Sequence, residues 1–264
     1  MDLPIYIFIG LLGLIIGSFL NVVVLRIHTK KISRGRSKCA SCNHTLETLD
    51  LVPFFSFLFL KGRCRYCGSR ISLQYPLVEI FTAIVYVGIY YHVLSITGGE
   101  ITSTVLYFIY FATTVSLLIA LAVYDIRHFV LPWKLMRLFL ILSFLGSLVI
   151  LFFQNNLSLI SFGAGFIVAL PFFLIWYFSK GHLIGLGDIM LMCGFGFLLG
   201  ILGGFSAVIF GFWIGTIFIF LKMIFTRKLL KAKTQIPFGP FLVLGFLFAF
   251  IFSFDISSLV KIFS

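Results

Sequence analysis

Charged side chains are scarce in this sequence. Only 11% of its 264 residues are Asp, Glu, Lys or Arg, and only eight of these are acidic. By contrast, 61% of the residues are hydrophobic and 35 are phenylalanine. A soluble domain of this length cannot bury so much apolar surface, so the composition excludes a soluble globular protein. We therefore expect an all-α polytopic membrane protein whose main surroundings are a lipid bilayer.

Apolar runs long enough to cross a bilayer recur along the chain, since a spanning helix needs about 20 mostly apolar residues. The first run has no basic region before it and no small-residue cleavage pattern after it, so we expect a retained helix rather than a signal peptide. Gly203-Gly204 divide the longest run, which brings the count to about eight transmembrane helices. The expected spans are 4–25, 77–96, 103–124, 133–153, 157–178, 188–203, 204–225 and 238–260.

Basic residues are missing from every second loop. Of the 20 Lys and Arg residues, 19 lie in the loops on one side of the expected bundle, and Lys261 is the exception. The positive-inside rule places these loops in the cytoplasm and both termini outside. The net charge of +12 then reflects topology, and we expect no nucleic-acid partner. The basic loops are 26–76, 125–137, 179–187 and 222–236.

Four cysteines form two CxxC pairs in the only long loop, residues 26–76. The pairs Cys39/Cys42 and Cys64/Cys67 are separated by 21 residues. Two such pairs can present four thiolates to one zinc ion, as in zinc ribbons. A reducing cytoplasm argues against two disulfides, which leaves reduced, unliganded thiols as the alternative. Because a small insert has little core of its own, we expect a structural zinc ion in a zinc-ribbon-like insert.

An apolar stretch, LVPFFSFLFL, lies between the two cysteine pairs at residues 51–60. It is too short to span a bilayer. We expect it to lie on the membrane interface or to pack against the helices.

Two aspartates lie at the ends of expected spans on the same side. Asp125 ends the third span and Asp188 begins the sixth. Two carboxyl groups that share a proton in a dry site can act as base and acid, activating water for attack on a peptide carbonyl. Alternatively, Asp125 pairs with Arg127 or His128 and Asp188 caps its helix. A third possibility is the ion or proton pathway of a transporter.

Glycines surround the second aspartate. Gly185 and Gly187 lack a Cβ atom, so they would let a substrate backbone approach and would permit positive φ angles. Gly196 and Gly200 are four residues apart, and this spacing favours close packing against a neighbouring helix.

At these residues the sequence resembles the GxGD intramembrane aspartyl proteases. The motif reads Gly185-Leu186-Gly187-Asp188, and Asp125 follows Tyr124. One branch, resembling signal peptide peptidases, carries a Pro-Ala-Leu element in a late span, where this sequence has IPFGPFL. That stretch, together with GSFLNVVVLRI and KGRCRYCGSRISLQYPLVE, resembles the type IV prepilin peptidase family. The three stretches occupy 236–242, 17–27 and 61–79.

The resemblance implies an aspartic endopeptidase of the bacterial inner membrane. Such an enzyme removes the basic leader of prepilin-like precursors at the cytoplasmic face, and many members also methylate the new amino terminus with S-adenosylmethionine. Asp125 and Asp188 would form the catalytic pair. Candidates for a substrate-binding or active-site loop are Gly185, Gly187, Pro237, Gly239 and Pro240, and candidates for the methyltransferase site are Asn21, Arg26 and Glu79.

Some features depart from the family pattern. Met190 stands where the family usually has a lysine, and Ala40 stands where a proline usually follows the first cysteine. The chain also lacks a glycine-rich Rossmann fingerprint, so it contains no independent signal for an S-adenosylmethionine pocket. The expected organisation is a first transmembrane helix (1–25), a cytoplasmic insert with four cysteines (26–76) and a seven-helix peptidase core (77–264).

Overall fold

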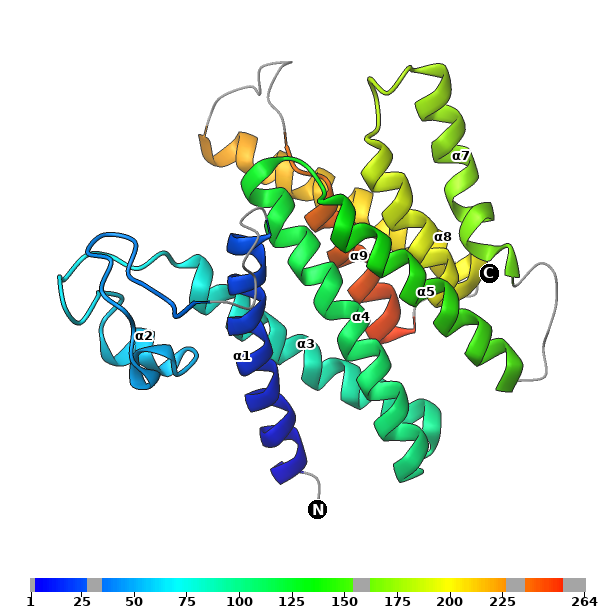
Figure 1. The fold of residues 1–264 in the computed structure, drawn as a ribbon. Coiled ribbons are helices and arrows are strands. Elements are labelled where there is room, and N and C mark those ends of the chain that lie inside the picture. Colours follow the sequence, from blue (N-terminus) through cyan, green and yellow to red (C-terminus); the bar gives the residue numbers. More distant parts are fainter. Residues whose placement is uncertain (1–2, 28–34, 154–161, 227–235, 254–264) are drawn as a thin grey trace. The chain divides into compact units, whose positions relative to one another are not determined.

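The computed structural model describes residues 3–27, 35–153, 162–226 and 236–253 (Figure 1). Within these ranges the regular elements are helices, and pairing between extended segments is limited to two isolated bridges. The all-α prediction is confirmed. The chain divides into two compact units, Met1–Ser116 and Leu117–Ser264, and the boundary falls inside one long helix. The expected division at residues 25 and 76 stays a prediction.

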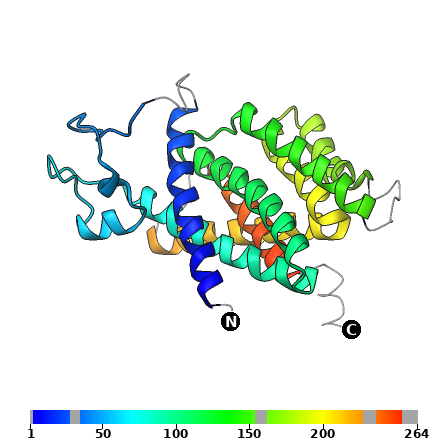
Figure 2. The ribbon, with the colours of Figure 1, turned by 60° about the horizontal axis from the view of Figure 1, so that its bottom comes forward.

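The first unit contains two closely packed helices, α1 (Leu3–Arg26) and α3 (Gln74–Thr97), seen from two directions in Figures 1 and 2. A Cβ atom at Gly13 would lie 2.6 Å from the Ala83 Cα, and one at Gly17 would lie 2.7 Å from the Glu79 Cα. Glycines therefore bring the two backbones together, as is common between helices in lipid. The insert between them holds a 3₁₀ turn, η1 (Thr48–Leu51), and a short helix, α2 (Phe55–Phe59).

The second unit begins inside α4 (Ile101–His128) and is built around buried aromatic rings. Phe139, Phe195 and Phe246 are fully buried, with ring centroids 6.5 Å apart for the first two and 4.9 Å apart for the last two. These rings pack three helices of the second unit against one another. The helices are α5 (Trp133–Phe153), α7 (Ala164–Phe178), α8 (Leu186–Thr226) and α9 (Gly239–Phe252).

Helix α8 is interrupted at Gly200, where φ is 73° and ψ is −173°. Glycine is essentially the only residue that adopts this conformation. The prediction of a break at Gly203-Gly204 was therefore wrong in position. The packing role expected for Gly200 was also wrong, because a Cβ atom there would meet nothing within 4 Å. Gly196 does pack closely, with its ideal Cβ 2.6 Å from the Ala164 carbonyl oxygen of α7.

Four helices of the described residues are long and apolar enough to cross a membrane, namely α1, α3, α4 and α8. Helices α7 and α9 are also apolar but shorter. These lengths and compositions identify a multi-pass membrane protein. The count of eight spans stays a prediction, and parts of the fifth and last expected spans (157–178 and 238–260) lie outside the described residues.

Candidate active site and metal centre

Asp125 connects the end of α4 to the start of α9. It lies in the last turns of α4 and is 5% exposed. Its Oδ2 atom accepts a hydrogen bond of 3.0 Å from the Gly239 backbone N–H. The first N–H groups of a helix have no partner inside the helix and favour a negative charge nearby. The start of α9 therefore holds this carboxylate in place.

The contact between Asp125 and Gly239 leaves no room for a side chain. A Cβ atom at position 239 would lie 2.8 Å from the Asp125 Oδ2. Pro240 follows in the first turn of α9, where the absence of an N–H has little cost. Pro237 is half-buried just before the helix. Of these three predicted loop residues, the structure brings Gly239 into direct contact with an aspartate.

Asp188 lies in the first turn of α8 and is half-buried. Its backbone N–H donates to the Gly185 carbonyl at 3.1 Å. Asp125 lies close enough to Asp188 in the second unit for a charge on one carboxyl group to act on the other. The structure thus brings together two residues that are far apart in the sequence. Their catalytic role stays a prediction.

The two glycines before Asp188 do not use the positive φ angles that glycine permits. Their expected role in admitting a substrate backbone stays a prediction. The backbone instead turns directly into α8. A Cβ at Gly187 would lie 2.8 Å from the Leu131 Cδ1, and one at Gly185 would lie 3.3 Å from the Asp188 Oδ2. Gly187 therefore permits close packing against the link between α4 and α5, a contact that has no signal in the sequence.

The four cysteines of the insert form one cluster. The sulfur atoms of Cys39, Cys42, Cys64 and Cys67 all lie within 4.8 Å of one another. The Cys39 and Cys67 sulfurs are 3.8 Å apart, and all four residues are free thiols. The structure therefore gathers the residues that the CxxC spacing singled out.

Both CxxC pairs have the same backbone construction. The Cys39 N–H donates to the carbonyl five residues further on, and its carbonyl accepts from the N–H four residues further on, at 3.0 Å each. Cys64 repeats both hydrogen bonds at 2.8 and 2.9 Å. The residues directly after each CxxC pair, Asn43 and Gly68, have φ angles of 58° and 69°. Asn and Gly are the residues that adopt this left-handed conformation most readily.

Hydrogen bonds to Cys39 favour its thiolate. Backbone contacts with Cys42 and Ser41, followed by the Ser69 hydroxyl, lower the pKa of the Cys39 thiol to about 6. The Ser69 hydroxyl also lies 3.1 Å from the Cys67 sulfur and lowers the pKa of that thiol. Because the thiolate is the form that binds metals, these contacts prepare Cys39 and Cys67 for a metal centre, whereas burial and the neighbouring thiols raise the pKa of Cys42 to about 11.

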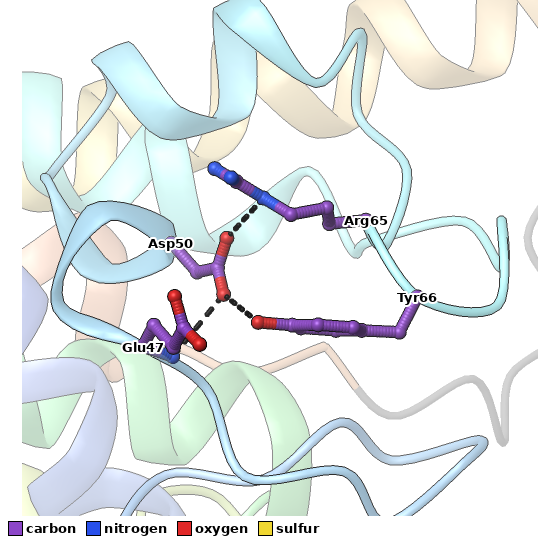
Figure 3. A network of polar contacts seen from close by, with 4 residues as sticks. All are labelled: Glu47, Asp50, Arg65 and Tyr66. Carbon is purple, nitrogen blue, oxygen red and sulfur yellow. Dashed lines mark hydrogen bonds and ion pairs between the residues drawn. The ribbon is translucent and has the colours of Figure 1, made fainter.

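Asp50 links the segment between the cysteine pairs to the second pair (Figure 3). Its side chain is 3% exposed and forms an ion pair of 2.8 Å with Arg65. The same carboxylate accepts hydrogen bonds from the Tyr66 hydroxyl and the Glu47 N–H, both at 3.1 Å. The Tyr66 ring lies 3.7 Å from the His44 ring of the first pair. The Asp50 carboxylate thus contacts the second cysteine pair directly and reaches the first through the Tyr66 ring, an arrangement that sequence reasoning did not identify.

Asn21, a predicted methyltransferase candidate, joins α1 to the start of α3. It is 1% exposed, and its amide nitrogen donates to the Gly17 and Tyr75 carbonyls at 3.3 Å each. Its amide oxygen accepts from the Gln74 side chain at 3.2 Å. These contacts support an anchoring role, and the methyltransferase assignment stays a prediction.

The other two methyltransferase candidates also contact the insert. The Arg26 guanidinium donates to the Gly35 carbonyl at 3.1 Å. Glu79 is 6% exposed, and its Oε2 atom accepts from the Phe54 backbone N–H at 2.7 Å. Both residues therefore fix the insert to the ends of the helices on either side of it.

Comparisons with known proteins cover both units. Residues 11–93 match the family model described as the bacterial peptidase A24 N-terminal domain, and residues 112–220 match the type IV leader peptidase family. A prepilin leader peptidase/N-methyltransferase of Vibrio cholerae is 30% identical over 266 residues, which is 95% of this chain and 98% of that protein. One of Bacillus subtilis is 31% identical over 249 residues, which is 93% of this chain and 94% of that protein. No solved structure matches the chain.

The first matched region contains the four cysteines, and the second contains Asp125 and Asp188. The resemblance seen in the sequence is confirmed, and it favours the prepilin peptidases over the signal-peptide-peptidase branch. The chain belongs to the type IV leader peptidase family of prepilin leader peptidases/N-methyltransferases.

Proposed function

We propose that this chain is an intramembrane aspartic endopeptidase that removes the leader from prepilin-like precursors and N-methylates the new amino terminus. The observation that carries the proposal is the pair formed by Asp125, held against the start of α9, and Asp188 in the first turn of α8. The names of the relatives support the choice of substrate. Family membership accounts for both aspartates, so a transporter is not needed to explain them.

The two carboxyl groups divide the acid and base work of peptide hydrolysis. One carboxylate takes a proton from water, whose oxygen attacks the scissile carbonyl carbon. The protonated partner donates to the carbonyl oxygen, and the C–N bond then breaks as the amine nitrogen gains a proton. The Gly239 N–H fixes one oxygen of Asp125 and leaves the other for water or substrate. Gly185 and Gly187 at the start of α8, and Pro237 and Pro240 at the start of α9, would surround the two carboxyl groups.

The site lies where α4 ends and where α8 and α9 begin, in keeping with hydrolysis at one face of the membrane. The basic loops support a cytoplasmic face, eight spans and external termini in the bacterial inner membrane. A prepilin would then present its basic leader to the aqueous side while its apolar helix stays in the bilayer.

The four cysteines are proposed to hold one structural zinc ion in a zinc-ribbon-like insert. A Zn–S bond of about 2.3 Å in tetrahedral geometry places the sulfurs roughly 3.8 Å apart. The separation of Cys39 and Cys67 and the compactness of the whole quartet fit this requirement. Zinc would join the two CxxC pairs and stabilise a segment that has little core.

Methylation requires S-adenosylmethionine, which supplies the methyl group to the new terminal amine. Arg26 and Glu79 are the candidates to bind near this chemistry, since both lie where the insert meets the membrane helices. Asn21 would position the same junction, because two of its three hydrogen bonds tie α1 to the start of α3.

Purified protein in lipid vesicles, incubated with a prepilin and S-adenosylmethionine, tests the function. Mass spectrometry should find a mature pilin that lacks its leader and carries one added methyl group. Cleavage without methylation would restrict the proposal to the peptidase. An intact precursor, in a preparation that keeps its helical content, would contradict the proposal.

A further inference from the structure

Residues 51–60, here called the apolar segment, expose large hydrophobic side chains on one face. Phe55, Leu58 and Phe59 are 41%, 58% and 79% exposed. Their spacing places them on one side of α2, since residues three and four apart are neighbours on a helix. Phe57 points the other way, because a Cβ at Gly62 would lie 2.9 Å from its ring. Helix α2 thus has an exposed apolar face with Phe55, Leu58 and Phe59, and a second face with Phe57 that packs against the insert.

Glu79 fixes the apolar segment at a defined level of α3. The hydrogen bond from the Phe54 N–H to the Glu79 carboxylate measures 2.7 Å, and Glu79 is 6% exposed. Glu79 lies five positions after Gln74, the first residue of α3, which corresponds to about 8 Å along the helix axis. Because α3 is a candidate membrane span, this contact holds the segment beside the first two turns of a transmembrane helix.

The backbone at the start of the segment supports a fixed position. Phe54 has a φ angle of 59°, which is uncommon for an aromatic residue. Conformations of this kind persist where surrounding contacts over-determine them. The bond to Glu79 is such a contact, so the segment is held by α3 and does not hang freely from the insert.

Positive charges follow the apolar face. Lys61 and Arg63 are exposed and come directly after the segment, and the exposed Arg70 follows after the second cysteine pair. Phenylalanine and leucine next to lysine and arginine is the composition of protein surfaces that lie in the interface of a bilayer. The basic residues complement anionic headgroups, and the apolar face complements the boundary of the acyl chains.

We propose that the apolar segment is an in-plane membrane anchor, whose Phe55, Leu58 and Phe59 insert into the lipid interface at the leaflet where α3 begins. It would hold the cysteine cluster close to the bilayer surface. The anchor does not depend on peptidase or methyltransferase activity, because it requires only that α3 spans the membrane.

Depth-dependent quenching by brominated lipids tests the anchor. The reporter is Phe59→Trp in a chain whose native Trp133, Trp176 and Trp213 are replaced by phenylalanine. The matched control is Ala40→Trp, an exposed position between the first two cysteines. Quenching in vesicles should be about twofold stronger at position 59 than at position 40. Leu58→Trp, on the same face, provides a second reporter if Phe59→Trp folds poorly.

Quenching at positions 58 and 59 that does not exceed quenching at position 40 would overturn the proposal. Self-association that shields these positions from lipid would assign the face to a second copy of the chain and would also overturn it. Vesicles with anionic lipid should give stronger quenching than zwitterionic vesicles. The double variant Lys61→Gln/Arg63→Gln should reduce that difference.

Discussion

The aspartate site and the cysteine cluster are built in opposite ways. The hydrogen bond between Asp125 and Gly239 joins residues 114 positions apart, and Asp188 comes from a third helix. In contrast, Cys39 and Cys67 are 28 positions apart, and each cysteine pair closes its own backbone hydrogen bonds. The aspartate site therefore depends on how whole helices pack, whereas the cysteine cluster depends on local turns and on the zinc ion that we propose for it.

Loss of a cysteine should have the largest effect on structure. Structural zinc sites contribute apparent free energies of about 10–16 kcal/mol, which a small insert cannot replace. Cys39→Ser should therefore lower the zinc content from about one ion per chain to almost none. Hydrogen exchange should accelerate across residues 36–70 while the amides of α8 and α9 remain protected.

Cys193→Ser is the matched control for this prediction, because Cys193 is the fifth free cysteine and lies in α8. It should leave the zinc content unchanged. Equal zinc contents in the wild type and Cys39→Ser would show that the cysteine cluster does not hold the ion.

A methyl group at position 239 should disturb the aspartate site and leave the insert intact. Gly239→Ala would place Cβ 2.8 Å from the Asp125 Oδ2, so the carboxylate or the start of α9 must move. A misplacement of about 1 Å can reduce a rate about 100-fold, and prepilin cleavage should fall by that order. Gly10→Ala is the control, since its Cβ would meet its nearest neighbour at 3.8 Å. If Gly239→Ala cleaved prepilin as fast as Gly10→Ala, the contact between Gly239 and Asp125 would not be needed for cleavage.

Asp50 should contribute a smaller stabilisation, confined to the insert. Asp50→Asn weakens the ion pair with Arg65 and the hydrogen bond from Tyr66. Hydrogen bonds to charged groups contribute about 1.5–3 kcal/mol, so local opening of the insert should become easier by a similar amount. Hydrogen exchange of Asp50→Asn, Arg65→Gln and the double variant forms a double-mutant cycle. Additive effects would mean that Asp50 and Arg65 do not act together.

The sequence was sufficient to predict features that depend on nearby residues. The CxxC spacing predicted the cysteine cluster because each pair folds as a short turn around its own backbone. The ends of the apolar runs correctly placed Asp125 in the last turns of one helix and Asp188 in the first turn of another. The apolar composition and the lengths of the apolar runs correctly indicated a multi-pass membrane protein.

Features that depend on distant residues were not predictable. A Pro-Phe-Gly-Pro stretch marks the start of a helix, but its spacing does not show that Gly239 donates to Asp125. The contact of Gly187 with Leu131 likewise depends on how the helices pack. The position of the break in α8 at Gly200 was not predictable either, because several glycines in this run allow a break.

Prepilin cleavage by Asp125→Asn and Asp188→Asn is the most direct test of the central claim. Asparagine keeps the size of aspartate, and at position 125 it can still accept the Gly239 N–H, so both variants should fold. An amide cannot take up or release the catalytic proton. General acid and base groups contribute about 10²–10⁴-fold to rates, and each variant should lose cleavage by at least the lower value. Cleavage at the wild-type rate by either folded variant would contradict the claim that these two aspartates form the catalytic pair.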